Sequence, residues 1–250
     1  MSSNPAIPTT SASIFPGEVF ANTEDFDAGI RCLLPHYDEM LETVARCLPE
    51  TCDRILELGC GTGELTQKIL QRCPQATAIA VDYSPRMLAR ARKKLVAAGL
   101  GNRVTWIEGD FGGWTQGELP AAEVWGKFDA CASALAIHHL TDEVKAALFQ
   151  KIRQCLKPGG CFWNADPVLP ESDRLKQVYQ AAREAWSAKQ GTTLDEVRAK
   201  LGMTQPQGYS GSDRLVSLDT QMQMLCQAGF ESLAVVWKYF GMAVVGGYVP

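Results

Sequence analysis

The stretch ILELGCGTG at residues 55–63 decides the fold of this chain. The apolar run Arg54–Leu58 leads into a turn with glycines at three alternate positions, and a helical pattern follows at once over Glu64–Arg72. Glycine tolerates a positive φ and lets a ligand approach the backbone closely. A strand, a glycine-rich turn and a helix in this order are typical of the ligand-binding corner of an open α/β sheet.

Strand and helix patterns alternate through most of the chain. We expect strands at 54–58, 77–81, 103–107, 128–133, 160–165, 232–239 and 242–248, and helices at 26–48, 64–72, 84–98, 141–156, 172–189, 194–201 and 217–228. Such alternation forms a parallel sheet with right-handed crossovers. The last two strands flank a short turn at Gly241, which predicts an antiparallel hairpin. The sequence therefore predicts an α/β fold with a doubly wound, mostly parallel sheet of seven strands.

Two segments depart from this alternation. Residues 1–15 begin with a run rich in Ser, Thr and Pro, which predicts a disordered tail rather than a signal peptide. Residues 16–250 are expected to form a single domain that starts with the helix over 26–48. Residues 167–215 are too long for an ordinary connection and hold two helical patterns, so a helical cap is expected after strand five.

Composition restricts the compartment and the partners. The formal net charge of −4 disfavours nucleic acid as the main partner, because nucleic-acid binders usually carry a basic footprint. The nine cysteines include no CxxC pair, which favours reduced thiols in a cytoplasmic protein without a metal. No apolar run is long enough to span a membrane. We expect a small molecule as the partner, and the residues favour no particular oligomeric state.

Two acidic residues follow strands near the glycine turn. Asp82 ends the second strand about 20 residues beyond the turn, where a carboxylate can accept hydrogen bonds from both hydroxyls of a ribose. Asp110 follows the third strand and could accept the exocyclic amine of an adenine, with Phe111 beside the ring. The spacing of Gly59, Gly61 and Gly63 differs from the GxGxxG of NAD-dependent oxidoreductases, which argues against that class.

Five ordered motifs resemble those of the class I S-adenosylmethionine-dependent methyltransferases, a Rossmann-like superfamily with many small-molecule enzymes. The matching segments are LELGCGTG at 56–63, VDYSPRML at 81–88, GDF at 109–111, FDACAS at 128–133 with AIHHL at 136–140, and LKPGG at 156–160. The resemblance covers about residues 54–165 and implies transfer of a methyl group from S-adenosyl-L-methionine to a small molecule by in-line displacement. The product from the cofactor would be S-adenosyl-L-homocysteine.

The resemblance also implies a set of cofactor-binding residues in this chain. They are Tyr37, Glu57, Gly59, Gly61, Asp82, Tyr83, Met87, Asp110, Phe111 and Ser133. Tyr37 joins the set because the N-terminal segment resembles the first helix of small-molecule methyltransferases, in which a tyrosine of a Pro-x-Tyr sequence reaches the cofactor.

Candidate catalytic residues follow the fourth strand. A nucleophile that attacks the methyl group can require a base, and the chain holds the histidines His36, His138 and His139. We predict His139 and His138 as the catalytic residues; the alternative is that either ring caps or packs against the following helix. Asp166 lies either near the mouth of the site or in a cap of the turn into Pro167.

Substrate contacts are expected from the cap. Its arginines, Arg174, Arg183, Arg198 and Arg214, could bind a carboxylate in bidentate fashion or lie on a solvated helix face.

Two alternatives keep the same cofactor. The N-terminal segment, with Phe26-Asp27 and Leu34-Pro35-His36-Tyr37, also resembles the carboxy-S-adenosylmethionine synthases of tRNA wobble-uridine modification. The turn Gly61-Thr62-Gly63 departs from those synthases and has the ordinary methyltransferase form. The second alternative is a non-catalytic module that binds S-adenosylmethionine.

Overall fold

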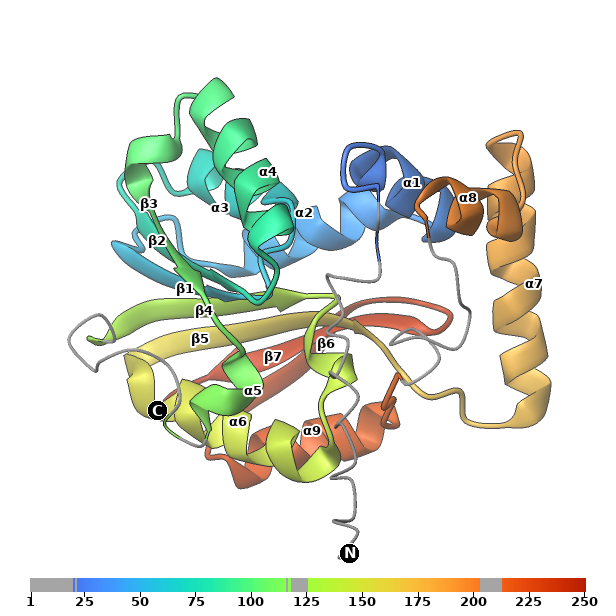
Figure 1. Ribbon diagram of the computed structural model, residues 1–250. Coiled ribbons are helices and arrows are strands. Elements are labelled where there is room, and N and C mark those ends of the chain that lie inside the picture. The colour runs from blue at the N-terminus through green and yellow to red at the C-terminus, as the bar shows by residue number, and fades with distance from the viewer. Residues whose placement is uncertain (1–19, 21, 116, 118–125, 203–212) are drawn as a thin grey trace, which may run out of the picture.

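A twisted sheet of seven strands runs through the molecule in the order β3-β2-β1-β4-β5-β7-β6 (Figure 1). The computed structural model describes residues 20, 22–115, 117, 126–202 and 213–250, so the predicted tail at 1–15 lies outside the described residues. The strands are β1 (Arg54–Leu58), β2 (Thr77–Asp82), β3 (Val104–Glu108), β4 (Phe128–Ala134), β5 (Leu156–Pro167), β6 (Glu231–Tyr239) and β7 (Met242–Tyr248).

The strand directions confirm the predicted doubly wound topology. Strands β1 to β5 pair in parallel, whereas β7 is antiparallel to both β5 and β6. The carboxyl ends of β1 to β5 therefore meet at one edge, where open α/β sheets bind their ligands. The C-terminal hairpin is present as predicted.

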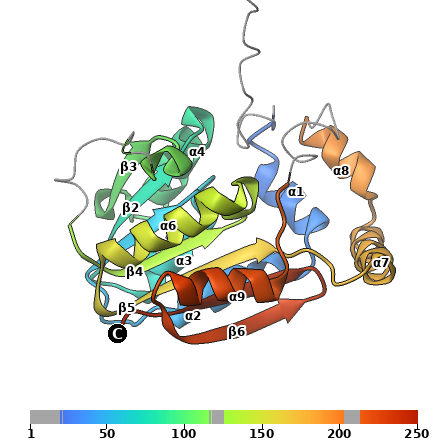
Figure 2. The same cartoon turned by 90° about the horizontal axis from the view of Figure 1, so that it is seen from below.

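Helices cover both faces of the sheet. They are α1 (Phe26–Leu33), α2 (Tyr37–Cys47), α3 (Glu64–Arg72), α4 (Pro85–Ala97), α5 (Phe111–Trp114), α6 (Asp142–Cys155), α7 (Asp173–Lys189), α8 (Leu194–Lys200) and α9 (Leu218–Gln227). Helices α2, α3 and α4 lie on one face, and α5, α6 and α9 lie on the other (Figure 1); α6 and α9 lie in front of the sheet in Figure 2. The side chains of Ser84 and Thr141 cap α4 and α6 at their N-termini.

The prediction of one continuous helix over 26–48 is wrong, because the structure has two helices in this range. Helix α1 ends at Leu33 and α2 begins at Tyr37. Pro35 disfavours helical geometry in the residue before it, and His36 adopts a positive φ of 56°. The break turns α2 onto the sheet and leaves α1 at the edge where the strands end.

Strand five is longer than the predicted 160–165. It begins at Leu156 and continues through the turn-like Lys157–Gly160 sequence. Gly159 has a φ of 75°, and the pairing of β4 with β5 shifts register between Phe128 and Ala130. This irregularity allows the strand to include Gly159 and Gly160, although the sequence pattern predicts that the strand begins only at residue 160.

The cap that follows β5 consists of α7 and α8, beside α1 (Figure 1). Leu194, Val197 and Leu201 of the cap form an apolar cluster with Leu33 of α1. Trp186 Nε1 donates to the carbonyl oxygen of Arg31 at 2.8 Å. These contacts place α7 beyond the carboxyl ends of the strands. Among the described helices, none combines the length and apolar character that a membrane crossing needs.

Candidate active site

The glycine turn between β1 and α3 has the backbone that its sequence predicts. Gly59, Gly61 and Gly63 have φ angles of 71°, 52° and 81°. A Cβ on Gly59 would lie 2.2 Å from the Cβ of Ala136, so the close approach requires glycine. A Cβ on Gly61 would meet no described atom within 4 Å. The turn therefore presents bare backbone to an open space.

Asp82 is fixed beside this turn by backbone donors. Its Oδ2 accepts the N–H of Gly61 at 2.7 Å, and its Oδ1 accepts the N–H of Ser84 at 2.9 Å. The residue is only 8% exposed. Because β2 ends here, the carboxylate lies at the ligand-binding edge of the sheet with its position set by two loops.

A cavity of about 170 Å³ adjoins the glycine turn and the end of β2. Its wall contains nine of the ten residues predicted to bind the cofactor: Tyr37, Glu57, Gly59, Gly61, Asp82, Tyr83, Met87, Asp110 and Phe111. These residues come from α2, β1, the glycine turn, β2 and the segments that follow β2 and β3. The structure thus brings together residues that are far apart in the sequence.

Ser133 is the one predicted residue that does not line this cavity. It is fully buried, and its Oγ donates to the carbonyl oxygen of Leu58 at 2.8 Å. The bond joins β4 to β1 directly before Gly59. The contact positions the glycine turn rather than the cavity surface.

Glu57 is a buried carboxyl group with an unused acceptor. It is 1% exposed, and its Oε2 has no hydrogen-bond partner among the described residues. Burial raises the pKa of Glu57 to about 8, although Thr66 opposes that rise. A cavity wall with this group can accept a hydrogen bond from a cationic ligand.

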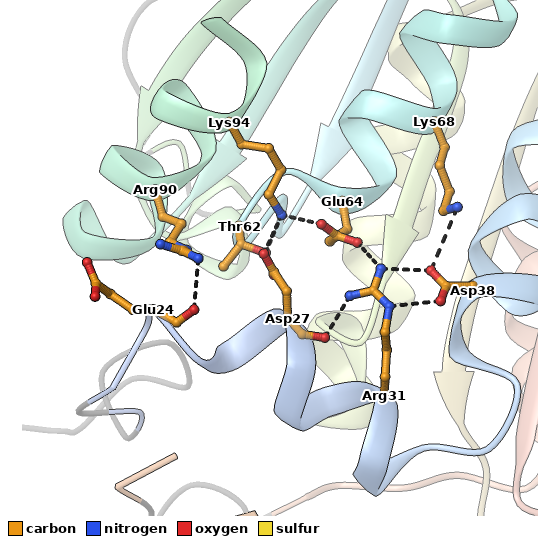
Figure 3. Close-up of polar contacts among 9 residues, drawn as sticks. All are labelled: Glu24, Asp27, Arg31, Asp38, Thr62, Glu64, Lys68, Arg90 and Lys94. Atoms are coloured by element: carbon orange, nitrogen blue, oxygen red, sulfur yellow. Dashed lines mark hydrogen bonds and ion pairs between the residues drawn. The ribbon is translucent and has the colours of Figure 1, made fainter. Parts of the chain in front are cut away.

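Helix α1 is tied to the glycine turn by a network of charged side chains (Figure 3). Asp27 accepts hydrogen bonds from Thr62 in the turn and from Lys94 Nζ of α4, the latter at 2.6 Å. Glu64 pairs with both Lys94 and Arg31. Burial raises the pKa of Glu64, but these two cations outweigh it and lower the pKa overall. The network holds α1 against the motif whose backbone lines the cavity.

The two predicted catalytic histidines lie in a single helical turn after β4, and their surroundings differ. His138 Nδ1 is 2.7 Å from Oδ1 of Asp166, which is buried at the end of β5. The other oxygen of Asp166 accepts the backbone N–H of His138 at 3.1 Å and Nδ2 of Asn164 at 2.9 Å. Asp166 is within hydrogen-bond distance of Nδ1, whereas Asp213 Oδ1 is 3.8 Å from Nε2, so the proton is favoured on Nδ1 and Nε2 is left as an acceptor. Asp166 therefore orients a potential base.

His139 lies beside His138, with ring centroids 3.9 Å apart and the ring planes tilted by 43°. Burial lowers the pKa of His139, and Asp213, whose Oδ1 is 3.4 Å from His139 Nδ1, opposes this effect. One ring nitrogen of each histidine and an oxygen of Asp213 lie within 4.8 Å of one another, a spacing that could hold a metal ion. That the site uses no metal stays a prediction.

A second and larger cavity, of about 1130 Å³, lies between the cap and the ends of the strands. It shares Phe20, Phe26, Leu135 and His139 with the smaller cavity, so the two adjoin. Its wall is mostly apolar and includes His138. The arrangement places the small cavity beside the glycine turn and the larger cavity beneath the cap on either side of His139.

Sequence reasoning missed two residues of this junction. Leu135 has a φ of 56°, a strained conformation for a residue with a branched side chain, and it lines both cavities. Asp213 lies within 4 Å of both histidines, although it is about 75 residues away from them in the sequence. Neither residue belongs to a motif, and no sequence signal marks either one.

Comparison with known proteins adds the family. A family profile described as "Methyltransferase domain" matches residues 55–160. An uncharacterized methyltransferase of Geobacillus sp. (strain WCH70) is 32% identical over 163 residues, which are 65% of this chain and 68% of the relative. The chain belongs to the class I S-adenosylmethionine-dependent methyltransferases. The predicted family is confirmed.

Solved methyltransferase structures share the fold. An O-methyltransferase family protein from Burkholderia thailandensis has a TM-score of 0.62 at 19% identity, over 93% of this chain and 62% of that one. A structure described as PigF with SAH has a TM-score of 0.55 at 18% identity, over 84% of this chain and 54% of PigF. This methyltransferase thus spans less than two thirds of each of these two longer chains.

The acceptor groups in the wall of the smaller cavity match the donor groups of the cofactor that this methyltransferase family uses. S-adenosylmethionine carries an ammonium group, two ribose hydroxyls and an adenine amine, all of which donate hydrogen bonds. The cavity wall offers carboxyl acceptors at Glu57, Asp82 and Asp110. The unpartnered Oε2 of Glu57 and the open space at Gly61 are features that such a ligand would fill.

Proposed function

We propose that this protein transfers the methyl group of S-adenosylmethionine to a small-molecule nucleophile held in the larger cavity. The observation that carries the proposal is the shared wall between a cavity lined by the cofactor motifs and an apolar cavity lined by His138. Such adjacency would bring two reactants together and exclude water, which lowers the barrier of an in-line displacement.

The residues of the smaller cavity have separate roles in this proposal. Asp82 accepts the ribose hydroxyls, and Asp110 with Phe111 holds the adenine. Glu57 accepts a hydrogen bond from the ammonium group, and Tyr37 of α2 forms part of the cavity wall. When bound, S-adenosylmethionine supplies an electrophilic methyl group on a sulfonium.

The acceptor side depends on the two histidines. His138 Nε2 accepts the proton of the nucleophile, while Asp166 holds the ring in the required tautomer and stabilises the resulting charge. His139, in the wall common to both cavities, packs beside the reacting groups. The apolar wall and the cap keep water from the site.

Native mass spectrometry of freshly purified protein tests the proposal. We expect a bound species with the mass of S-adenosylmethionine or S-adenosylhomocysteine, and saturable calorimetric binding of S-adenosylhomocysteine. A bound cofactor heavier by one CO₂ unit would instead establish the carboxy-S-adenosylmethionine synthase alternative. If no adenosyl ligand is bound and S-adenosylhomocysteine gives no saturable binding, the enzyme assignment is contradicted.

The raised pKa of Glu57 predicts a pH dependence of cofactor binding. Below about pH 8 the free protein holds a proton on Glu57, and an ammonium group favours the ionised carboxylate. Binding therefore releases a proton, and the affinity for S-adenosylhomocysteine should rise roughly tenfold between pH 6 and 7. The same shift costs the free protein stability as pH rises from 4.5 to about 8.

Calorimetry in two buffers of different ionisation enthalpy measures that proton release. Glu57→Gln should weaken binding and flatten its pH dependence, whereas Glu143→Gln, on the exposed first turn of α6, should change neither. A wild-type affinity that is constant from pH 6 to 7 would contradict the role given to Glu57.

A further inference from the structure

The larger cavity combines an apolar wall with cationic side chains from the cap. Arg183 of α7 and Arg198 of α8 line it, as does Arg214 near the histidines. Arg174, at the start of the same α7, does not line the cavity. The structure therefore separates the arginines that the sequence left equivalent.

Arg183 forms no ion pair within 4 Å in the described part of the chain. Its Nε is sealed from solvent and donates to no described acceptor, and no described carboxylate forms an ion pair with its guanidinium. Burial lowers the pKa of Arg183 and the like charge of Arg198 lowers it further, while the negative charge of Asp213 opposes both effects without reversing them. Arg183 therefore brings to the cavity wall a partly buried positive charge that the described side chains offset only in part, which costs free energy and points to an anionic ligand.

The other arginines near the cavity show the contrast. Arg198 pairs with Asp195 at 3.0 Å, and Arg214 is exposed, so water can solvate its charge. Asp213, a wall carboxylate, lies within 4 Å of both His138 and His139. Arg183 is thus the guanidinium in this wall that is best placed to take a carboxylate from outside the chain.

We propose that Arg183, with Arg198 as a second cation in the same wall, binds a carboxylate group of the methyl acceptor. The acceptor class is then a small carboxylic acid with an apolar body, since a guanidinium matches a carboxylate in bidentate geometry and the remaining wall is apolar. The inference rests on the proposed function, because it takes the larger cavity as the acceptor site. The carboxylate would anchor the acceptor, while its nucleophilic atom faces His138.

Matched probes test this inference. Benzene, indole and naphthalene rings, each as the carboxylate and as the neutral amide, are titrated calorimetrically into the full-length protein with and without S-adenosylhomocysteine. For at least one ring we expect the carboxylate to bind about tenfold more tightly than its amide. Arg183→Met should abolish that preference and leave amide binding unchanged, and Arg174→Met should keep it. Equal affinities in every pair, or a preference that survives Arg183→Met, would overturn the inference.

Thermal unfolding supplies a second measurement. Methionine fills similar space without the charge, so Arg183→Met should leave the melting temperature of the ligand-free protein unchanged or raise it. A clear drop would mean that Arg183 has a structural partner, which would contradict its role as a ligand anchor.

The two proposals fail in different ways. Arg183 does not line the smaller cavity, so S-adenosylhomocysteine should bind Arg183→Met with wild-type affinity. If the wild-type protein binds S-adenosylhomocysteine but binds carboxylates no more tightly than amides, only the proposed acceptor class is refuted. Absence of S-adenosylhomocysteine binding would refute the proposed function, while the carboxylate titrations still decide whether Arg183 binds an anion.

Discussion

Asp82→Ala is expected to lower the affinity for S-adenosylhomocysteine about 100-fold, because two charge-assisted hydrogen bonds to the ribose together contribute about 3 kcal/mol. The variant also removes the acceptor that holds the N–H groups of Gly61 and Ser84. The glycine turn would then lose the contact that sets its distance from β2. Isothermal titration calorimetry gives the affinity directly.

Two further variants make the Asp82 result specific. Asp82→Asn keeps one oxygen acceptor and should lose about tenfold in affinity, roughly 1.4 kcal/mol. Glu143→Ala, an exposed carboxylate on α6, should bind like the wild-type protein. If Asp82→Ala stays folded by circular dichroism and binds S-adenosylhomocysteine normally, the ribose role of Asp82 is wrong.

The fold was predictable where local chemistry and the sheet agree. The glycine turn at 59–63, the N-cap Ser84 with Pro85 behind it, and the hairpin turn near Gly241 each specify their element from a few neighbouring residues. The break between α1 and α2 was not predicted, although Pro35 marks it. The apolar spacing continues across that break, because both helices bury side chains in neighbouring parts of the same core.

The cofactor cavity was more predictable than the acceptor cavity for a physical reason. Parallel strands end at one edge, so residues just after β1, β2 and β3 must meet there whatever the loops do. Ser133 shows the limit of this reasoning, because it lies in β4 itself and turns to the carbonyl of Leu58.

The acceptor side depends on contacts between segments that are distant in the sequence. Asp166 meets His138 only because β5 pairs with β4 in a defined register, and Asp213 returns to the histidines after the whole cap. Arg198 pairs locally with Asp195 within α8, whereas the place of Arg183 in the cavity wall depends on the docking of α7 on α1. Residue type alone does not distinguish Arg183 from Arg174.

Asp166→Asn is expected to reduce the rate of methyl transfer about 100-fold or more, the usual contribution of a positioned general base. An amide in this place still accepts one hydrogen bond, but His138 Nδ1 no longer faces a carboxylate that requires its proton. The ring can then take the tautomer with the proton on Nε2, which cannot accept a proton from the nucleophile. Single-turnover transfer to any acceptor of the wild-type protein measures the change.

A tautomer measurement tests the same claim without an acceptor. Nitrogen-15 NMR of the imidazoles should show His138 protonated at Nδ1 in the wild-type protein, and the Nε2-protonated form should gain population in Asp166→Asn. The smaller cavity is unchanged in this variant, so the affinity for S-adenosylhomocysteine should stay at the wild-type value.

A matched carboxylate at the opposite edge of the sheet provides the control. Asp129, at the start of β4, accepts the backbone N–H groups of Asp53 and Arg54 at 3.0 and 2.9 Å and pairs with Lys157. Asp129→Asn should therefore lower stability but leave both the transfer rate and the His138 tautomer unchanged. If Asp166→Asn and Asp129→Asn slow transfer equally, Asp166 acts through stability alone. His138 would then lose its assignment as the oriented base, because the carboxylate would not control the nitrogen that receives the proton.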